Sequence, residues 1–381
     1  MSNIYAGIRR AFGKDVEGAR HCADRLLKIR ARQAELRERK CDSSLLLATW
    51  NLRDFDSNKF GFGPRRTESF YYIAEMISCF DLVAVQEVNR DLSAWEKVMA
   101  ILGREWDYIA TDTTEGPGGN GERMVFVYNT EKVWFRKIAG EIVLPEGQQV
   151  VAQKKVRGES GTSELVEKNL QFARSPFLVA FQAGWFRFSL CTAHLYYGAA
   201  SGPALEQRID EIRKMVAFFA DRQDTASKQE KDRHGAVENY IVLGDFNVVS
   251  PKHKTMEALK SSGFVVPEQI DGDKVRKEGD HFYDQIAVRV KDPRFKVLGG
   301  GILHMYEDVF RDEDLDYYKS SLPATDPEGG AAAAKTPEAI YRKWRTWQMS
   351  DHHPLWIEIQ TDFTESYLGD IVTGKSDPKP A

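Results

Sequence analysis

The sequence predicts an α/β fold in which two packed mixed sheets are flanked by helices, a four-layer α-β-β-α sandwich. From Ser44 onward, short apolar strands alternate with amphipathic helical patterns. Two of the strands, at residues 177–181 and 185–193, flank a Gln-Ala-Gly turn and indicate a hairpin. Strands this numerous, with a hairpin among them, fit two packed sheets better than one purely parallel sheet.

Composition is typical of a globular protein that crosses no membrane. The 381 residues are 42% hydrophobic and 29% charged, with a net charge of −4. No apolar run approaches the roughly 20 residues that span a bilayer, and the first residues lack the apolar core of a signal peptide. Four cysteines are scattered without a CxxC pair: Cys22, Cys41, Cys79 and Cys191. They indicate reduced thiols, so we expect a cytoplasmic protein.

Residues 1–43 are predicted to form an N-terminal amphipathic helical extension. Apolar residues recur there at helical spacing among Arg, Lys and Glu: Val16, Ala19, Ala23, Leu26, Ile29 and Leu36. We favour packing of this helix against the main domain over an arm that binds a protein partner.

Residues 44–362 are predicted to form one domain. Apolar strand patterns lie at residues 45–50, 81–85, 123–128, 177–181, 185–193, 240–243, 282–290 and 354–359, and helical patterns at 66–78, 93–102 and 204–221. Residues 145–169 are charged and contain glycine, which predicts a long loop. Residues 301–349 form a larger insertion, and residues 363–381 are predicted to be a polar tail.

Polar residues fall in or at the ends of six of the apolar strands. They are Asn51, Glu87, His194, Asp245 with Asn247, Asp284, and Asp351 with His352. Each alone has an ordinary explanation, such as a turn, a surface ion pair or a core histidine. A carboxylate beside a buried strand is costly unless it is paired or bound to a metal. Their conjunction predicts that the six strand ends meet at a common rim.

Six motifs carry a resemblance to a known family. Thr-Trp-Asn-Leu, Val-Gln-Glu-Val, Thr-Ala-His-Leu, Leu-Gly-Asp-Phe-Asn, Tyr-Asp-Gln and Ser-Asp-His-His-Pro-Leu follow in that order. Residues 44–360 thereby resemble the endonuclease/exonuclease/phosphatase superfamily, whose fold is deoxyribonuclease-I-like. The resemblance implies a metal-dependent enzyme that hydrolyses phosphodiester bonds with water.

The resemblance also implies a cofactor. Oxygen ligands without cysteine favour a hard cation, Mg²⁺ first, with Mn²⁺ as a possible substitute. Glu87 would be the principal ligand, helped by Asn51 and Asp351. One metal is expected, since a second would draw on Asp245 and Asn247.

Catalytic roles follow by the same resemblance. His352 would be the active histidine, oriented by Asp284, whereas His353 would occupy a variable position. Glu122 would support His194 as a second carboxylate–histidine pair. Either the two histidines divide acid and base catalysis, or Asp245 orients the water while both stabilise the phosphorane.

Two arginines are predicted to hold the substrate phosphate. Arg174 lies in Phe-Ala-Arg-Ser-Pro-Phe and resembles the phosphate-binding arginine of deoxyribonuclease-like members, and Arg123 is a weaker candidate. A surface salt bridge is the alternative for Arg174.

DNA is the expected partner and an endonuclease the expected activity. A phosphatase or phosphodiesterase of a small or lipid phosphate ester, an RNA nuclease and a non-enzymatic binding module are the alternatives. The chain lacks the Pro-x-Trp-Cys-Asp-Arg run of the inositol-phosphatase group, and Arg53 stands where abasic-site endonucleases carry an acidic residue. In the insertion, Ile340, Trp344 and Trp347 fall at helical spacing and favour core packing, with Arg342, Lys343 and Arg345 left outward and available to phosphate.

Overall fold

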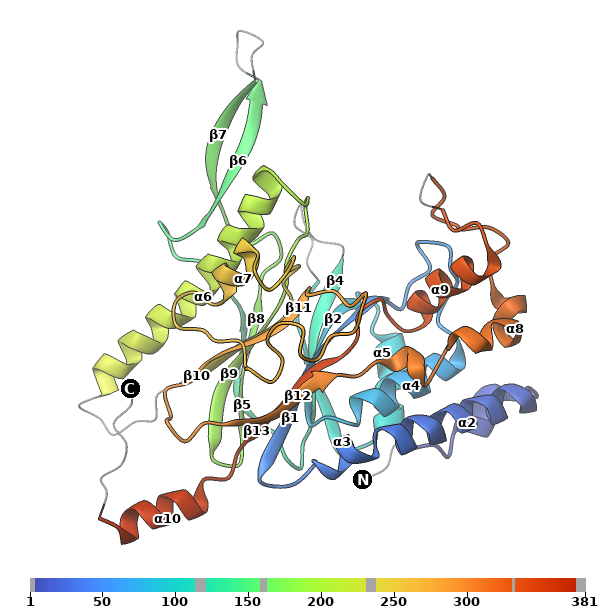
Figure 1. Cartoon of the computed structure of the whole chain (residues 1–381), viewed down its shortest axis with the longest axis horizontal. Coiled ribbons are helices and arrows are strands. Elements are labelled where there is room, and N and C mark those ends of the chain that lie inside the picture. The colour runs from blue at the N-terminus through green and yellow to red at the C-terminus, as the bar shows by residue number, and fades with distance from the viewer. Residues whose placement is uncertain (1–3, 114–120, 158–162, 231–237, 331–332, 375–381) are drawn as a thin grey trace. The chain divides into compact units, whose positions relative to one another are not determined.

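A computed structural model describes residues 4–113, 121–157, 163–230, 238–330 and 333–374. The chain divides into two compact units (Figure 1). The first unit comprises Met1–Ala110, Glu122–Lys132 and Ile302–Trp356, and the second comprises Thr111–Gly121, Val133–Gly301 and Ile357–Ala381. Each contains a sheet of parallel and antiparallel strands with helices beside it. Two mixed sheets with helices beside each confirm the predicted α/β fold class.

The sheet of the first unit contains four strands that lie wholly within it. They run in the order β1 (Ser44–Phe55), β2 (Leu82–Asn89), β4 (Glu122–Asn129) and β3 (Trp106–Ala110). β1 and β2 are parallel, whereas β4 is antiparallel to both β2 and β3. The register pairs Asn51 with Gln86 and Asn89 with Glu122. This pairing brings the polar ends of β1 and β2 and the beginning of β4 to the same edge.

Helices α4 (Thr67–Ile77) and α5 (Ser93–Leu102) share the core of the first unit with this sheet. Trp50 on β1, Tyr72 on α4 and Trp95 on α5 are fully buried in that core. The boundary between the units falls within β12 (Val297–Ile302) and β13 (Leu355–Gln360). On β13, Leu355, Ile357 and Ile359 are all buried, and Glu358 between the last two is buried as well.

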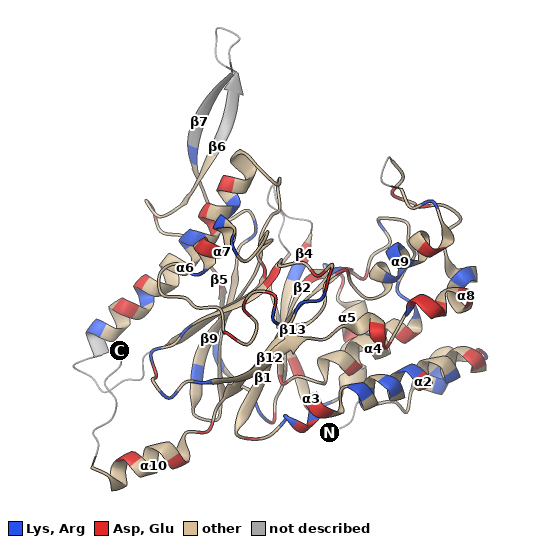
Figure 2. Cartoon of the chain, in the orientation of Figure 1, with Lys and Arg blue, Asp and Glu red and all other residues tan. Residues whose placement is uncertain are grey.

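The N-terminal extension packs on the first unit, as we favoured, but in three helices. They are α1 (Ile8–Phe12), α2 (Val16–Arg32) and α3 (Ala34–Glu38). Asp15 caps α2 by accepting a 2.8 Å hydrogen bond from the backbone N–H of Gly18. α2 buries Cys22, Leu26 and Ile29 and packs against α4. Charged residues are distributed along the whole helix (Figure 2). Val16, expected on the buried face, is 67% exposed because it stands in the first turn.

The insertion folds as short helices that bind the extension. They are η1 (Met305–Glu307), η2 (Asp312–Asp314), α8 (Leu315–Tyr318), η3 (Lys319–Ser321) and α9 (Pro337–Gln348). Arg25 of α2 donates to Asp314 across 2.6 Å, and both side chains are buried. Arg32 reaches Asp308, also at 2.6 Å, and the ring of His21 stacks on Tyr317 with centroids 3.9 Å apart. Segments almost 300 residues apart therefore form one structure.

Helix α9 confirms the core-packing prediction and corrects its corollary. Ile340, Trp344 and Trp347 are buried. The three cations were predicted to face outward and be available to phosphate. Arg342 does face outward, with its side chain 61% exposed, whereas the side chains of Arg345 and Lys343 are only 14% and 24% exposed. Arg342 and Arg345 pair with Asp312 at 2.8 and 2.7 Å, and Lys343 pairs with Asp326 at 2.9 Å and with Glu328. The insertion neutralises its own basic residues with its own acidic ones.

The sheet of the second unit has five strands in the order β11 (Asp284–Arg289), β10 (Asn239–Asp245), β9 (Phe186–His194), β8 (Phe177–Ala183) and β5 (Trp134–Glu141). β9 and β10 are parallel and the other pairs are antiparallel. The predicted β8–β9 hairpin is confirmed. Its turn needs Gly184, which has φ +53°, and a Cβ there would lie 2.8 Å from the carbonyl oxygen of Thr361. Helices α6 (Pro203–Glu230) and α7 (Lys254–Leu259) belong to this unit.

Several elements depart from the sequence predictions. The loop predicted at residues 145–169 is wrong, since β6 (Val150–Arg157) pairs with β7 (Ser163–Leu170) as an antiparallel ribbon that extends beyond α6 (Figure 1). Its backbone ladder forms without an alternating apolar pattern. Part of the predicted polar tail forms helix α10 (Thr364–Val372), and residues 375–381 lie outside the described residues.

Among the described residues, we find no helix with the length and apolarity to cross a membrane.

Candidate active site

The predicted site residues fall into two sets, each within one unit. The first set lies in the first unit and comprises Asn51, Glu87, Glu122, Arg123, Asp351 and His352. The second set lies in the second unit and comprises Arg174, His194, Asp245, Asn247 and Asp284. We describe each set by its own contacts.

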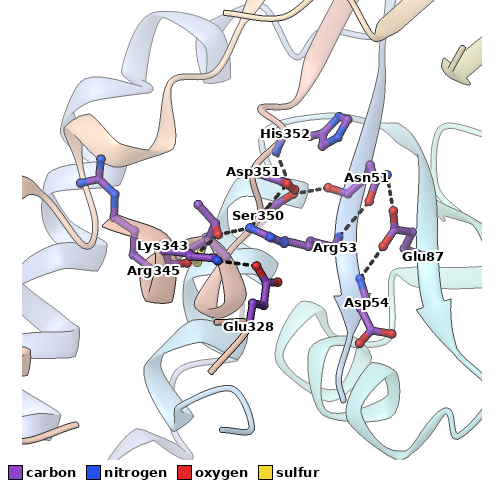
Figure 3. A network of polar contacts seen from close by, with 12 residues as sticks. Asn51, Arg53, Asp54, Glu87, Glu328, Lys343, Arg345, Ser350, Asp351 and His352 are labelled. Atoms are coloured by element: carbon purple, nitrogen blue, oxygen red, sulfur yellow. Dashed lines mark hydrogen bonds and ion pairs between the residues drawn. The ribbon is translucent and has the colours of Figure 1, made fainter. Parts of the chain in front are cut away.

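Asn51 and Glu87 form the centre of the first set. Nδ2 of Asn51 donates to Oε1 of Glu87 at 2.8 Å, and the backbone N–H of Asp54 donates to Oε2 at 2.8 Å (Figure 3). Oδ1 of Asn51 accepts from the backbone N–H of Arg53, also at 2.8 Å. The Glu87 side chain is thus oriented from two directions, yet the residue is only half-buried.

The backbone around this pair adopts an uncommon conformation. The φ angles of Glu87, Arg53 and Asp54 are 60°, 45° and 50°. They lie in the left-handed region that non-glycine residues seldom occupy. Such strain persists only where surrounding contacts enforce it, and it clusters at functional sites. The cluster supports a functional role for the pair.

Arg65 supplies those contacts from beneath. Its Nη2 donates to the carbonyl oxygen of Leu52 and, at 3.1 Å each, to those of Arg53 and Met349, while Nη1 reaches the carbonyl of Asp54 at 3.4 Å. Burial lowers the pKa of the Arg65 guanidinium to about 10, so the side chain stays charged near neutral pH. One buried cation therefore fastens the strained end of β1 to the segment that precedes Asp351.

The Ser-Asp-His segment is attached to β1 through Ser350. Its Oγ donates to the carbonyl oxygen of Asn51 at 2.6 Å and accepts from the backbone N–H of His352 at 2.9 Å. Nε1 of Trp50 donates to the carbonyl of His352 at 2.9 Å. His352 itself is half-buried, and its backbone position is fixed relative to Asn51.

Asp351 contacts a cation in the first set. Its Oδ2 lies 3.5 Å from Nη1 of Arg53 (Figure 3). The guanidinium of Arg53 stands 4.0 Å from the centre of the Trp347 ring. The predicted role of Asp351 as a metal ligand stays a prediction. His353 accepts a hydrogen bond from the backbone N–H of Met305 at 3.4 Å, and its assignment to a variable position stays a prediction.

Glu122 and Arg123 begin β4 opposite the end of β2. The register pairs Arg123 with Val88 and Glu122 with Asn89, which places both residues near the strand that carries Glu87. Nε of Arg123 donates to the carbonyl of Arg90 at 3.3 Å, and Glu122 is buried. Their catalytic and phosphate-binding roles stay predictions.

Three residues of the second set form a row across neighbouring strands. Asp245 at the end of β10 is in register with His194 at the end of β9 and with Asp284 at the start of β11. Nε2 of His194 lies 3.8 Å from Oδ2 of Asp245. Gly244 makes this closeness possible, because its φ is +130° and a Cβ there would lie 2.1 Å from the carbonyl oxygen of Ala193.

Asn247 ties the row to the segment after β9. Its backbone N–H donates to Oδ1 of Asp245 at 2.9 Å, and its Nδ2 donates to the carbonyl of Leu195 at 2.8 Å. The φ of Asn247 is 49°, a conformation that asparagine tolerates better than most residues. Asp245 and Asn247 thus behave as one rigid turn.

Arg174 joins the second set through His194. Its Nη1 lies 2.7 Å from both ring nitrogens of His194, and both side chains are buried. Behind it, burial raises the pKa of Glu211 on α6 to about 7, against the opposing effects of a hydrogen bond from Gln207 and the charge of Arg174. The predicted phosphate-binding arginine and the predicted catalytic histidine are therefore neighbours.

The first set fits a hard divalent cation. Glu87 and Asn51 offer carboxylate and amide oxygens, the ligands that Mg²⁺ and Mn²⁺ take. Both carboxylate oxygens of Glu87 are oriented by donors at 2.8 Å. The predicted pairs of Asp284 with His352 and of Glu122 with His194 stay predictions.

Sequence reasoning missed four residues that shape these sets: Arg53, Arg65, Ser350 and Glu211. Ser350 had a signal, since it begins the Ser-Asp-His motif. The other three are ordinary charged residues in the sequence, and only tertiary contacts assign them a place.

Comparison with known proteins finds similarity in structure alone. No family model matches the chain, and no curated protein matches it. An endonuclease/exonuclease/phosphatase family protein from Bacteroides thetaiotaomicron is 19% identical, covers 84% of this chain and 98% of its own, and has a TM-score of 0.44. A mannosyl-6-phosphatase from the same organism is 19% identical, with coverages of 83% and 99% and a TM-score of 0.45.

A third similar structure is D. rerio TDP2 complexed with a single-strand DNA product. It is 13% identical, covers 84% of this chain and 100% of its own, and has a TM-score of 0.47. The first of these structures bears the name of the family that the six motifs resemble.

Proposed function

We propose that the protein is a Mg²⁺-dependent phosphoric ester hydrolase that cleaves phosphodiester bonds, and specifically a DNA endonuclease of the cytoplasm. The row formed by His194, Asp245 and Asp284, with Arg174 against His194, carries this proposal. It gathers an imidazole and two carboxylates on adjoining strands, with a cation from the segment before β8 beside them, and phosphoryl transfer needs these groups.

The first set would hold the cation. Glu87 provides the charged ligand and Asn51 an amide oxygen, both kept in place by the hydrogen bonds around them. When bound, Mg²⁺ would neutralise developing charge on the phosphate oxygens. The remaining chemistry belongs to side chains of the protein.

The second set would contact the phosphate and the attacking water directly. Arg174 has a planar fork of donors that suits two oxygens of one phosphate. Asp245 accepts protons or orients water, and Asn247 fixes its carboxylate by a backbone hydrogen bond of 2.9 Å. That both sets serve one phosphodiester stays a prediction, and mutation of one residue from each set tests it.

One sequence feature favours DNA over an inositol phosphate. The motif of inositol phosphatases is missing around Asp284. Among structures of similar fold, TDP2 was solved with a DNA product, although a mannosyl-6-phosphatase shares the fold too. A fold alone does not name a substrate, so the assay decides.

Nicking of supercoiled plasmid tests the proposal. We expect cleavage with Mg²⁺ or Mn²⁺, none with EDTA, and none with His352→Ala or Asp245→Asn protein. Activity should fall steeply with added salt, because contacts to the DNA backbone release counterions. Absence of nicking together with metal-dependent hydrolysis of a sugar phosphate would refute the endonuclease and favour a phosphatase.

A further inference from the structure

Two tyrosines follow the second set directly and are exposed. β9 ends at His194, which is 7% exposed, and Leu195 is fully buried. Tyr196 and Tyr197 come next, and they are 51% and 43% exposed. Two adjacent aromatic rings in water at the end of a catalytic strand contribute little to the core, so folding alone does not explain them.

The segment that carries these tyrosines is fixed to the second set. The backbone N–H of Leu195 donates to the carbonyl of Asp245 at 2.9 Å, and Asn247 holds the carbonyl of Leu195 at 2.8 Å. Gly198 then turns the chain with φ +65°, where a Cβ would lie 2.9 Å from Cβ of Ala204 at the start of α6. The tyrosines are therefore held on both sides.

Arg208 of α6 braces Tyr197 from the interior. Its Nη1 donates to the carbonyl of Tyr197 at 2.8 Å, and its guanidinium lies 4.6 Å from the centre of the Tyr197 ring. The side chain is 1% exposed, and within the described part of the chain Nε and Nη2 have no hydrogen-bond partner. Burying a cation this way costs stability. The charge of Arg208 is also attracted by the carboxylate of Asp245, so this one side chain links Tyr197 to the second set.

We propose that Tyr196 and Tyr197 form a stacking surface for an unpaired nucleobase of the substrate. Aromatic rings stack on the face of any base, and rings that are already fixed lose little entropy on binding. A nucleotide whose phosphate contacts Arg174 and His194 would place its base beside residues only two or three positions further along the chain. The inference rests on the proposed function and narrows its substrate to DNA with accessible bases, such as single strands.

The test is a binding cycle that separates bases from phosphates. A fluorescein-labelled pentanucleotide of deoxythymidine is compared with a pentamer of the same charge whose central three residues are abasic. Anisotropy titrations in EDTA and low salt give affinities without cleavage. The proteins are the full chain, Tyr196→Ala/Tyr197→Ala, Tyr196→Phe/Tyr197→Phe and, as a matched exposed aromatic, Trp134→Ala.

We expect the full chain to prefer the base-bearing oligonucleotide by roughly tenfold or more, the size of a lost stacking contact. The double variant Tyr196→Ala/Tyr197→Ala (the Ala pair) should lose this preference. The double variant Tyr196→Phe/Tyr197→Phe (the Phe pair) and Trp134→Ala should keep it. Phe preserves the ring, and the group that Arg208 holds is a backbone carbonyl. Circular dichroism melting checks that the Ala pair is folded.

Two results would overturn the inference and can be told apart. Equal affinity for both oligonucleotides, unchanged in the Ala pair, would refute stacking and leave the phosphodiesterase proposal intact. Failure to bind either oligonucleotide would refute the surface as a nucleic-acid site. Metal-dependent hydrolysis of bis(4-nitrophenyl) phosphate then decides separately whether the protein is a phosphodiesterase.

Discussion

Asn51 donates its amide N–H to the carboxylate of Glu87 across 2.8 Å and thereby joins the ends of two parallel neighbouring strands. The contact fixes the glutamate before any ligand arrives. A pre-oriented carboxylate binds a cation without first losing side-chain freedom. The contact also predicts which substitutions should matter and how.

Glu87→Gln removes the charge but keeps the shape of the side chain. We expect Mn²⁺ affinity, measured by electron paramagnetic resonance, to fall at least about tenfold because the charged oxygen ligand is lost. Metal-dependent hydrolysis should fall with it. Glu141→Gln, at an exposed position on β5, is the control and should bind Mn²⁺ normally. Unchanged Mn²⁺ affinity in Glu87→Gln would remove Glu87 from the metal site.

Arg174 is expected to act through its planar fork as well as its charge. Arg174→Ala should lower kcat/KM for a phosphodiester by roughly 100-fold, and Arg174→Lys should recover only part of the loss. The exposed Arg213, 3.9 Å from Asp210, serves for comparison and should tolerate Ala without effect. Full activity in Arg174→Lys would show that a point charge suffices.

Ser350 is expected to hold the Ser-Asp-His segment on β1. Ser350→Ala leaves the carbonyl of Asn51 and the N–H of His352 without this partner in a buried place. The free energy of unfolding should fall by about 1–3 kcal/mol in urea titrations. Ser201→Ala, at an exposed position, should change it little. Equal stability of the two variants would mean that other contacts position His352.

Glu211 predicts a pH dependence of stability. Burial raises its pKa from an ordinary 4.5 to about 7, so between these values the folded protein holds a proton that the unfolded chain releases. The free energy of unfolding should therefore fall as pH rises from about 4.5 to about 7, by on the order of 3 kcal/mol from this group.

Glu211→Gln should abolish that part of the decline. The free energy of unfolding of the variant should therefore increase relative to that of the parent protein as pH rises. Urea titrations of both proteins at pH 5 and pH 8 measure the effect. A constant difference between them at the two pH values would show that Glu211 is ionised throughout. Gln keeps a group that can accept the hydrogen bond from Gln207.

The sequence predicted the strand ends because their signal is local. An apolar run that stops at a polar residue marks both a strand and its end, as at Asn51 and Asp245. The strand β5 was missed because its last five residues are exposed or nearly so and show no alternation. The β6–β7 ribbon was missed because its sequence is mixed in charge and shows no apolar alternation.

The buried and paired charges could not be predicted. Nothing in Gly-Pro-Arg-Arg-Thr distinguishes Arg65, which is buried under β1, from Arg66 beside it. The sequence around Lys343 suggests a side chain available to phosphate, but its Nζ donates to Asp326, which lies 17 residues earlier. Partners that are distant in sequence decide the role of a charge, and single-sequence patterns do not contain that distance.

The ion pair of Arg25 with Asp314 constrains the order in which the protein assembles during synthesis. Arg25 leaves the ribosome 289 residues before its partner, so the first unit cannot complete its core until the insertion has been translated. Residues 133–301 of the second unit are contiguous and can fold while the rest is still being made. For most of translation, the N-terminal helices of the nascent chain therefore expose a surface that only the last quarter of the chain covers. A chaperone would be needed during that interval.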